Sequence, residues 1–433
     1  MREMNLLNLL LLLAHVAVAL GVVLLVALAG RTVARLLRQP EVIGEIVAGL
    51  LSGPAAIAVL GRGTFDAMLP DRVFGVIELI AQAGLVLFLV GLAHSLGSGP
   101  SGPARRATAW VAAGSLLPTL LTGALLAGWV LLTDDAAARG DAPLASFLLM
   151  VMVSMSITAV PVLARILTDR GMSGSEAGRL AMSAAIVIDA VGWLLLTLAI
   201  SLGTGDVAGL LHSGQALALG VLCALAIRFG ARTGPARRLC VRLPRTAGLL
   251  LGGTTLGVAL SMEHLGMTAI LGAALVGFAV PAGGEDAHWG RAVRTVSRSG
   301  RALAPAFFVV TGITVLSGAF ADASWTLICG TVALGCAGKL LGGYAGARMA
   351  RQPRGTALRI GVLMNTRGLT ELIVLQAGYS AGILTAPLVL ALIVMALATT
   401  ALTGPLLDLL DRVGPPLPAG KVSVATATES SVR

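Results

Sequence analysis

The chain has 433 residues, 56% of them hydrophobic and only 12% charged, and its mean hydropathy is +0.91. Soluble domains carry about 25% charged residues, so this composition excludes a soluble globular protein and predicts an all-α, multi-pass (polytopic) membrane protein. The net charge of +10 does not indicate a nucleic-acid partner, because the basic residues lie in short segments between apolar runs.

Apolar runs of about 20 residues, the length that crosses a bilayer as a helix, predict about 13 transmembrane helices. The first run ends in Ala27-Leu28-Ala29, which imitates a signal cleavage site. It is too long for a signal-peptide core of about 7–15 residues, so we expect a retained membrane helix. The predicted spans are 6–29, 40–60, 73–96, 108–132, 144–167, 178–202, 207–227, 246–262, 265–281, 302–318, 324–347, 356–378 and 383–407.

The distribution of Lys and Arg predicts the orientation of these spans. With the N-terminus outside, the inside segments hold 25 of the 31 basic residues and the outside segments hold four. This asymmetry follows the positive-inside rule and predicts a cytoplasmic C-terminus in a cytoplasmic (cell) membrane. Residues 1–412 are then one transmembrane domain, and 413–433 are expected to form a short disordered cytoplasmic tail with no soluble regulatory domain.

The second span opens with Pro40, and Glu41 and Glu45 follow it. Proline at the first helical position and acids near the start are ordinary helix-start chemistry, so these acids are interpreted as structural.

The fifth span contains Ser156 and Thr158 shortly before Pro161. Proline removes a backbone donor and clashes with the preceding turn, so this span is either a broken helix or a simple proline kink.

The sixth span contains Asp189 as the single ionisable residue between Leu180 and Leu202. A charge near the bilayer centre costs roughly 2.5–3.5 kcal/mol on insertion scales, which makes Asp189 a candidate functional residue. The alternative is an acid that packs against a hydroxyl or a cation and only holds helices together.

The eleventh span carries Lys339 among small and apolar neighbours, which favours a deep position over one that snorkels to the surface. A buried ammonium needs either a carboxylate partner or a lowered pKa. Outside the twelfth span and the start of the second, Asp189 and Glu78 are the available carboxylates.

The twelfth span contains Asn365, Thr366, Arg367 and Glu371 near its centre. Arg367 and Glu371 are spaced to pair on one helix face, and the pair either staples the bundle or belongs to a second break. Two broken helices at corresponding places in two halves are typical of a transporter site, where exposed helix-end carbonyls can help to bind a cation.

These segments resemble the monovalent cation:proton antiporter-2 family of the sodium/proton exchanger superfamily, with a Kef-type membrane domain. The similar motifs are QPEVIGEIVAGLLSGP, SITAVPVLARIL, AAxxxDxxxW around Asp189, FFVVTGI and LMNTRGLTELIVL, in an order that covers nearly the whole chain. The resemblance implies the sodium/proton antiporter fold, with inverted repeats (spans 1–6 and 8–13) and two crossing broken helices. It also implies a core of spans 4–6 and 11–13, a dimer domain of spans 1–3 and 8–10, span 7 as linker, and a homodimer.

The resemblance also implies roles for individual residues. Asp189 matches the acid that binds the ion or the proton, with Thr158 and Ser156 at the neighbouring break, and Lys339 matches the basic residue of the core. The second crossing helix is matched by Asn365, Thr366, Arg367 and Glu371. Ile188 departs from the pattern, because many members have a second polar residue there.

The sequence therefore predicts an antiporter that exchanges protons for sodium or potassium ions within membrane lipid. The alternatives are a proton-coupled exporter of an organic cation or metabolite, and a gated cation channel. An enzyme is not expected, because the chain has no HExxH and no GxSxG motif. Its four cysteines form no CxxC pair, so no cofactor is expected and no metal beyond the transported cation.

Overall fold

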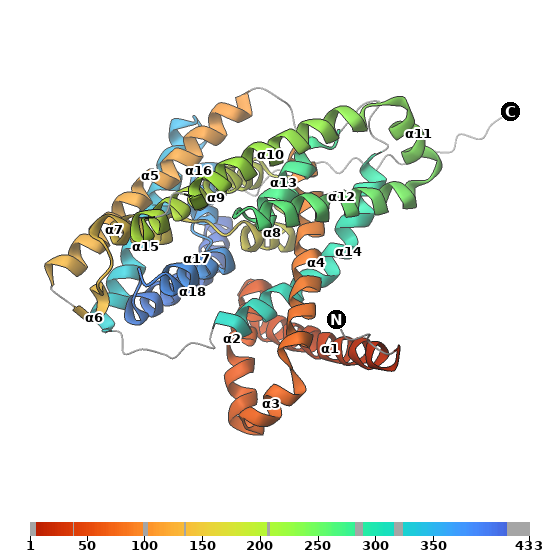
Figure 1. Ribbon diagram of the computed structural model, residues 1–433. Helices are drawn as coiled ribbons and strands as arrows, with labels where there is room; N and C mark the ends of the chain where they lie inside the picture. Colours follow the sequence, from red (N-terminus) through yellow and green to blue (C-terminus); the bar gives the residue numbers. More distant parts are fainter. Residues whose placement is uncertain are drawn as a thin grey trace.

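The computed structural model describes residues 6–37, 39–97, 103–133, 136–205, 208–281, 289–315 and 324–413. Within these ranges the chain forms eighteen α-helices and no strand, which confirms the predicted all-α class. Figure 1 shows the helices packed into one bundle, with α1–α3 gathered at one end. The predicted tail lies outside the described residues from 414 onward.

The helices of the first half occupy the first six predicted spans. Two short helices, α3 and α6, lie between spans, and the fifth span is divided into α7 and α8. The bounds are α1 (Leu6–Leu36), α2 (Glu41–Leu60), α3 (Arg62–Met68), α4 (Asp71–Gly97), α5 (Pro103–Leu132), α6 (Ala136–Arg139), α7 (Leu144–Ser156), α8 (Val160–Asp169) and α9 (Glu176–Thr204).

The helices of the second half occupy the remaining seven predicted spans. The twelfth span is divided into α16 and α17, and a short helix, α11, precedes the eighth span. The bounds are α10 (Ala208–Ala231), α11 (Gly234–Arg242), α12 (Pro244–His264), α13 (Ala269–Ala279), α14 (Trp289–Val315), α15 (Trp325–Met349), α16 (Arg354–Met364), α17 (Leu369–Ser380) and α18 (Ala386–Val413).

Nine helical segments of the described chain are long and apolar enough to cross a membrane, counting α7 and α8 as one. The other four predicted spans are also helical, at α12, α13, α14 and the α16–α17 pair. Helix α14 begins at Trp289, well before the predicted start at 302. Its four arginines from Arg291 to Arg301 interrupt the apolar run while the helix continues through them.

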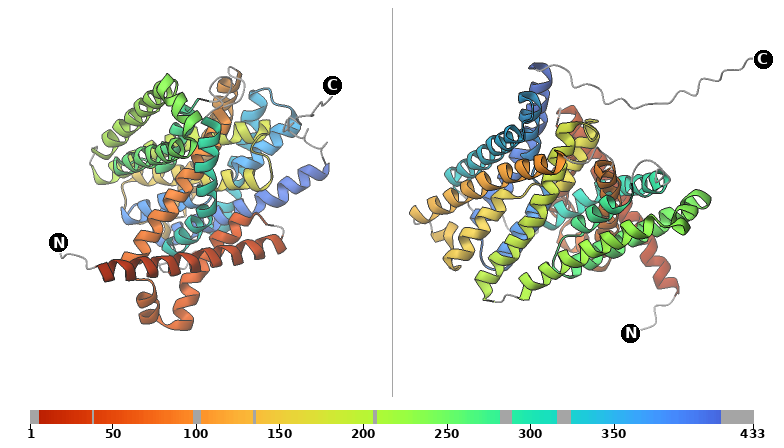
Figure 2. Two further views of the ribbon diagram at one scale, coloured as in Figure 1. Left: turned by 90° about the vertical axis from the view of Figure 1, so that its right-hand side faces the viewer. Right: turned by 90° about the horizontal axis from the view of Figure 1, so that it is seen from above.

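Close helix pairs form the body of the protein. Helix α4 packs along α14, α5 along α15, and α1 along α2. The α5–α15 contact depends on glycine, because a Cβ on Gly114 would overlap the backbone of Gly346. Small residues let membrane helices approach in this way. Figures 1 and 2 place α10 and α12 side by side along one edge, while α8 and α17 lie near the middle of Figure 1.

Candidate functional site

The fifth span is a broken helix rather than a kinked one. Helix α7 ends at Ser156 and α8 begins at Val160, with Ile157 and Ala159 in extended conformation between them. Pro161 lies in the first turn of α8, where a missing N–H breaks no intrahelical hydrogen bond.

The twelfth span is broken as well, between Met364 and Leu369. Gly368 has φ 154° and ψ −135°, a conformation that is essentially restricted to glycine, and a Cβ there would clash with Val162. Helix α18 fixes this break, because the Thr400 hydroxyl accepts from the Arg367 N–H (2.8 Å) and donates to its carbonyl (2.9 Å). The Asn365 amide donates to the carbonyl of Thr399 (3.1 Å), while the Thr366 hydroxyl donates within its own segment to Leu363.

The two breaks meet. The N–H of Ala159 donates to the carbonyl of Thr366 (3.2 Å), and the Thr158 hydroxyl donates to that of Met364 (3.4 Å). Four half-helices therefore end at one crossing, which confirms the predicted pair of crossing broken helices.

Two fully buried cations bind the C-terminal end of α7. The Lys339 ammonium donates to the Ser156 carbonyl (2.5 Å) and to the hydroxyls of Thr158 (2.7 Å) and Ser115 (3.3 Å). The last carbonyls of a helix have no intrahelical partner and carry partial negative charge, so a cation placed there is stabilised.

The second of these cations is Arg367. Its guanidinium donates to the carbonyls of Met155 (2.5 Å) and Ser154 (3.3 Å) and pairs with Glu371 (3.2 Å). Arg367 and Glu371 are both 0% exposed, so the predicted pair forms in the interior.

Lys339 and Arg367 use acceptors that the sequence did not identify. Lys339 has no carboxylate within ion-pair distance among the described residues, because three neutral oxygens satisfy its ammonium instead. The carbonyls at the end of α7 accept hydrogen bonds from Lys339 and Arg367, and their expected help in binding a transported cation stays a prediction.

Asp189 lies in the middle of α9 and is 1% exposed. Neither carboxylate oxygen accepts a hydrogen bond from any residue that the structure describes. Gly192, one turn further on the same helix face, lies against Ile157 in the first break. Asp189 therefore sits on the face of α9 that meets the crossing, and no protein cation or hydroxyl in the described part neutralises it.

The remaining predicted site residues are buried, most of them at or beside the two breaks. The Ser156 hydroxyl donates back to the Val153 carbonyl in its own helix (3.0 Å), and the Thr158 hydroxyl is shared between Lys339 and Met364. Asn365, Thr366, Arg367 and Glu371 are all buried at or beside the second break. Ile188, the departure from the family pattern, is also fully buried.

The acids of the second span do more than begin a helix. Glu41 pairs with Arg31 of α1 (2.6 Å) and with Arg165 of α8 (3.2 Å). Glu45, 0% exposed, lies 3.4 Å from Arg31 and 3.6 Å from Arg165. Arg165 also pairs with Asp169 (3.0 Å), so this ion cluster ties α1 and α2 to α8. The structural interpretation from sequence was incomplete because the partners come from other helices.

Ser115 and Thr400 also contact the candidate site and were not predicted from the sequence. Ser115 accepts from Lys339, and Thr400 holds the backbone of Arg367. Their only sequence signal is a hydroxyl in an apolar span, which many membrane helices share and which indicates no particular partner.

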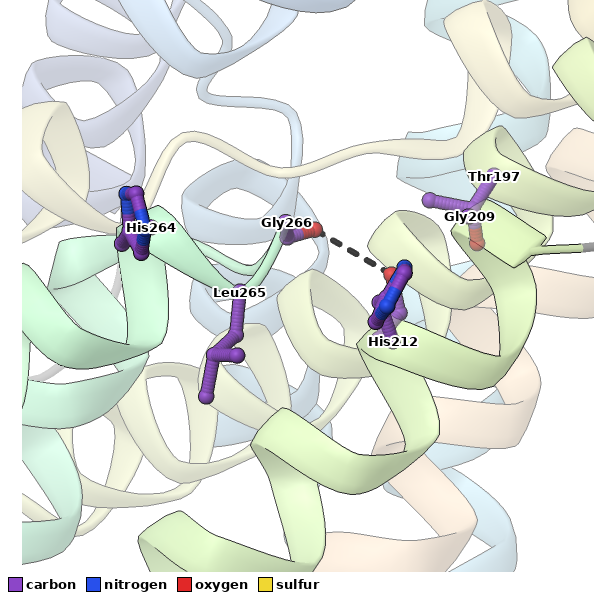
Figure 3. A pocket seen from close by; sticks show the side chains of 7 residues that line it. Thr197, Gly209, His212, His264, Leu265 and Gly266 are labelled. Carbon is purple, nitrogen blue, oxygen red and sulfur yellow. Dashed lines mark hydrogen bonds between the residues drawn. The ribbon is translucent and has the colours of Figure 1, made fainter.

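A hollow of about 380 Å³ opens elsewhere, between α9, α10 and the turn after α12 (Figure 3). The Ser213 hydroxyl donates to the Gly266 carbonyl across it (3.2 Å), and His212 and His264 lie on opposite sides of Gly266. Its lining does not include Asp189 or either break.

Comparison with known proteins identifies the family. The model for "Sodium/hydrogen exchanger, transmembrane" matches residues 21–410, nearly the whole chain. The chain belongs to the sodium/hydrogen exchanger family. This is a family of transporters, in agreement with the expectation that the protein is not an enzyme.

Individual members of the sodium/hydrogen exchanger family are similar along most of this chain. Cation/H(+) antiporter 20 of Arabidopsis thaliana is 36% identical, covering 85% of this chain and 45% of the plant protein. Na(+)/H(+) antiporter NhaS4 of Synechocystis sp. is 30% identical, covering 92% of this chain and 97% of its own. The chain thus spans about half the length of the plant relative and nearly all of the cyanobacterial one.

A solved structure supports the fold of the sodium/hydrogen exchanger family. The sodium proton antiporter MjNhaP1 from Methanocaldococcus jannaschii matches with a TM-score of 0.58 at 15% identity, covering 91% of this chain and 96% of that one. At this identity the match shows the fold alone, and it agrees with the predicted sodium/proton antiporter fold.

Proposed function

We propose that this protein exchanges protons for monovalent cations, sodium or potassium, by alternating access, and that Asp189 binds either a proton or a cation. The observation that carries this proposal is the buried Asp189 carboxylate without a protein partner. A buried, unpaired carboxylate is costly, so it needs a proton or a cation to neutralise it. One carboxylate holds one of the two at a time, and this competition couples the two flows.

Relatives support the same reaction. Proteins similar to this chain bear the names cation/H(+), Na(+)/H(+) and K(+)/H(+) antiporter. The motif LMNTRGLTELIVL favours the monovalent cation:proton antiporter-2 branch, of Kef type, within the wider family.

The fixed cations have a separate role in this proposal. Lys339 and Arg367 hold the crossing together by binding α7 carbonyls, so neither is free to neutralise Asp189 in this conformation. Thr158 and Ser156 lie at the break beside α9 and are the proposed residues nearest to the ion path. The charge changes of the cycle then occur at Asp189.

We also propose the division into moving parts. A core of α5–α9 and α15–α18 would move against a dimer domain of α1–α4 and α12–α14, with α10 as linker, in a homodimer embedded in the lipid of a cell membrane. The N-terminus would lie outside and the C-terminus in the cytoplasm. In this arrangement the ion cluster of Arg31, Glu41, Glu45, Arg165 and Asp169 crosses the boundary between the parts, so movement must break some of its ion pairs.

The test is dissipation of a preset pH gradient in everted vesicles or proteoliposomes on addition of sodium, potassium or lithium. Wild-type protein should dissipate the gradient with at least one of these cations. Asp189→Asn should abolish the response because an amide exchanges no proton, while Asp141→Asn, at an exposed loop position, should retain it. Full activity of Asp189→Asn protein would remove Asp189 from the mechanism. Ionic current without coupled proton movement would favour a channel, and proton movement driven only by organic cations would favour the exporter.

A further inference from the structure

An arginine-rich segment lies at one end of the bundle, where α10 leads through α11 into α12 (Figure 1). It carries six arginines, and the sequence has no acidic residue between position 228 and Glu263. The six are Arg228, Arg232, Arg237, Arg238, Arg242 and Arg245.

Helix α11 is amphipathic. Cys240 is buried at 1% exposure on one side, whereas Arg238 and Arg242 are exposed on another. A short basic helix between two apolar helices is typical of a segment that lies at the level of the lipid headgroups.

An apolar hollow of about 200 Å³ lies among the same helices. Its lining includes Ile227 of α10, Leu239 of α11, Leu251 of α12 and Trp289 at the start of α14. The Trp289 indole donates to the Ala231 carbonyl (3.1 Å), which fixes the ring as one wall. Several of the arginines are sequence neighbours of lining residues: Arg228 follows Ile227, and Arg238 precedes Leu239.

We propose that this hollow binds one acyl chain of an anionic phospholipid, whose phosphate is bound by arginines of the α10–α12 segment. Apolar hollows exclude water but accept hydrocarbon, and arginine binds phosphate through paired N–H donors. Basic residues at headgroup level attract anionic lipid, so the charge and the lining select the same ligand. This site is independent of the proposed exchange at Asp189.

A second copy of the chain fits this face less well. A symmetric dimer contact uses the same surface patch on both subunits, so it would place two sets of these arginines together. Such juxtaposed like charges repel.

The test uses the purified full chain in neutral phosphatidylcholine nanodiscs that contain increasing fractions of phosphatidylglycerol with brominated acyl chains, which quench tryptophan fluorescence on contact. The Trp289 signal is the difference between wild type and Trp289→Phe. We expect brominated phosphatidylglycerol to quench it at a mole fraction roughly tenfold or more below that needed with brominated phosphatidylcholine.

Two variants and one control sharpen the result. Arg238→Gln with Arg242→Gln should remove the preference for phosphatidylglycerol, whereas Arg105→Gln with Arg106→Gln, at exposed positions of α5, should retain it. Ala236→Phe should reduce quenching by filling the hollow while leaving every arginine in place.

Equal quenching of Trp289 fluorescence by the two lipids would overturn the proposal. Binding of inorganic phosphate to the same arginines, together with equal quenching, would identify the ligand as a free anion. Quenching of Trp289 that decreases as protein density in the membrane rises and dimers form would assign this face to a second copy of the chain. That result would also overturn the proposal.

Discussion

Replacing Arg367 by alanine should destabilise the fold much more than replacing Glu371 by glutamine. Arg367 makes three contacts, with the carbonyls of Ser154 and Met155 and with the carboxylate of Glu371. Among the described residues, the Glu371 carboxylate accepts from Arg367 alone, through Oε1. The two changes therefore remove different numbers of buried interactions.

The contacts set the magnitudes. Arg367→Ala leaves a buried carboxylate unpaired and two helix-end carbonyls without their cation, which costs about 3–5 kcal/mol. Glu371→Gln leaves Arg367 its two carbonyl acceptors and supplies a neutral oxygen, so it costs about 1–2 kcal/mol. In the double variant no carboxylate is left unpaired, so its cost should fall below the sum of the single costs by roughly 1–3 kcal/mol.

The assay is the apparent midpoint of unfolding in one detergent at one scan rate, because membrane proteins unfold irreversibly and only the ranking is then comparable. The expected order is wild type, then Glu371→Gln, then Arg367→Ala, with the double variant at or above Arg367→Ala. A Glu371→Gln midpoint as low as that of Arg367→Ala, or additive costs, would refute the assigned contacts. An unchanged midpoint with transport lost would mean that the pair acts in transport and not in holding the fold.

Gly114→Ala should lower the unfolding midpoint, by the equivalent of about 1–3 kcal/mol, because its Cβ would meet the backbone of α15. Gly128→Ala, on the same helix but facing open space, should leave the midpoint unchanged. Equal midpoints would contradict the close α5–α15 contact. Exchange in proteoliposomes with a fixed pH gradient should not vary with clamped voltage, because one proton replaces one monovalent cation and Lys339 keeps its three acceptors. A membrane potential contributes about 2.3 kcal/mol per charge per 100 mV, so net charge movement would shift the reversal point of exchange with voltage. If such a shift is seen, Lys339→Gln should make exchange independent of voltage again. In a cysteine-free background, a reagent that cannot cross the membrane should label Ala137→Cys from outside and Thr233→Cys only after permeabilisation, and the reverse pattern would overturn the orientation.

Hydropathy predicted most of the fold because the bilayer requires an apolar run of fixed length at each crossing. Helix α14 begins before the predicted span at 302, since Arg291, Arg294, Arg298 and Arg301 end the apolar run without ending the helix. Arginines three or four residues apart occupy one face, so a helix can continue through them.

The breaks were predictable for a different reason. Pro161 and the polar run from Asn365 to Glu371 are unfavourable in a continuous lipid-facing helix, so the sequence indicates where each span is interrupted, although it left a simple kink possible at Pro161. The pairing of Arg367 with Glu371 was predictable from their spacing. The backbone carbonyls that Lys339 and Arg367 bind were not predictable, because every residue carries one. Which carbonyl lies free depends on where a distant helix ends.

The crossing has a consequence for the order of biosynthesis. Lys339 binds the carbonyl of Ser156, which lies 183 residues earlier in the chain, and Arg367 binds that of Met155, 212 residues earlier. At roughly 5–20 residues per second, the ribosome delivers these cations about 10–40 s after α7 is made. In hydrocarbon, the carbonyls at the end of α7 have no water from which to accept hydrogen bonds in the meantime. The first broken helix can therefore reach its final form only when the second half of the chain has entered the membrane. Until then, the free carbonyls of the first break need hydrogen-bond donors other than Lys339 and Arg367.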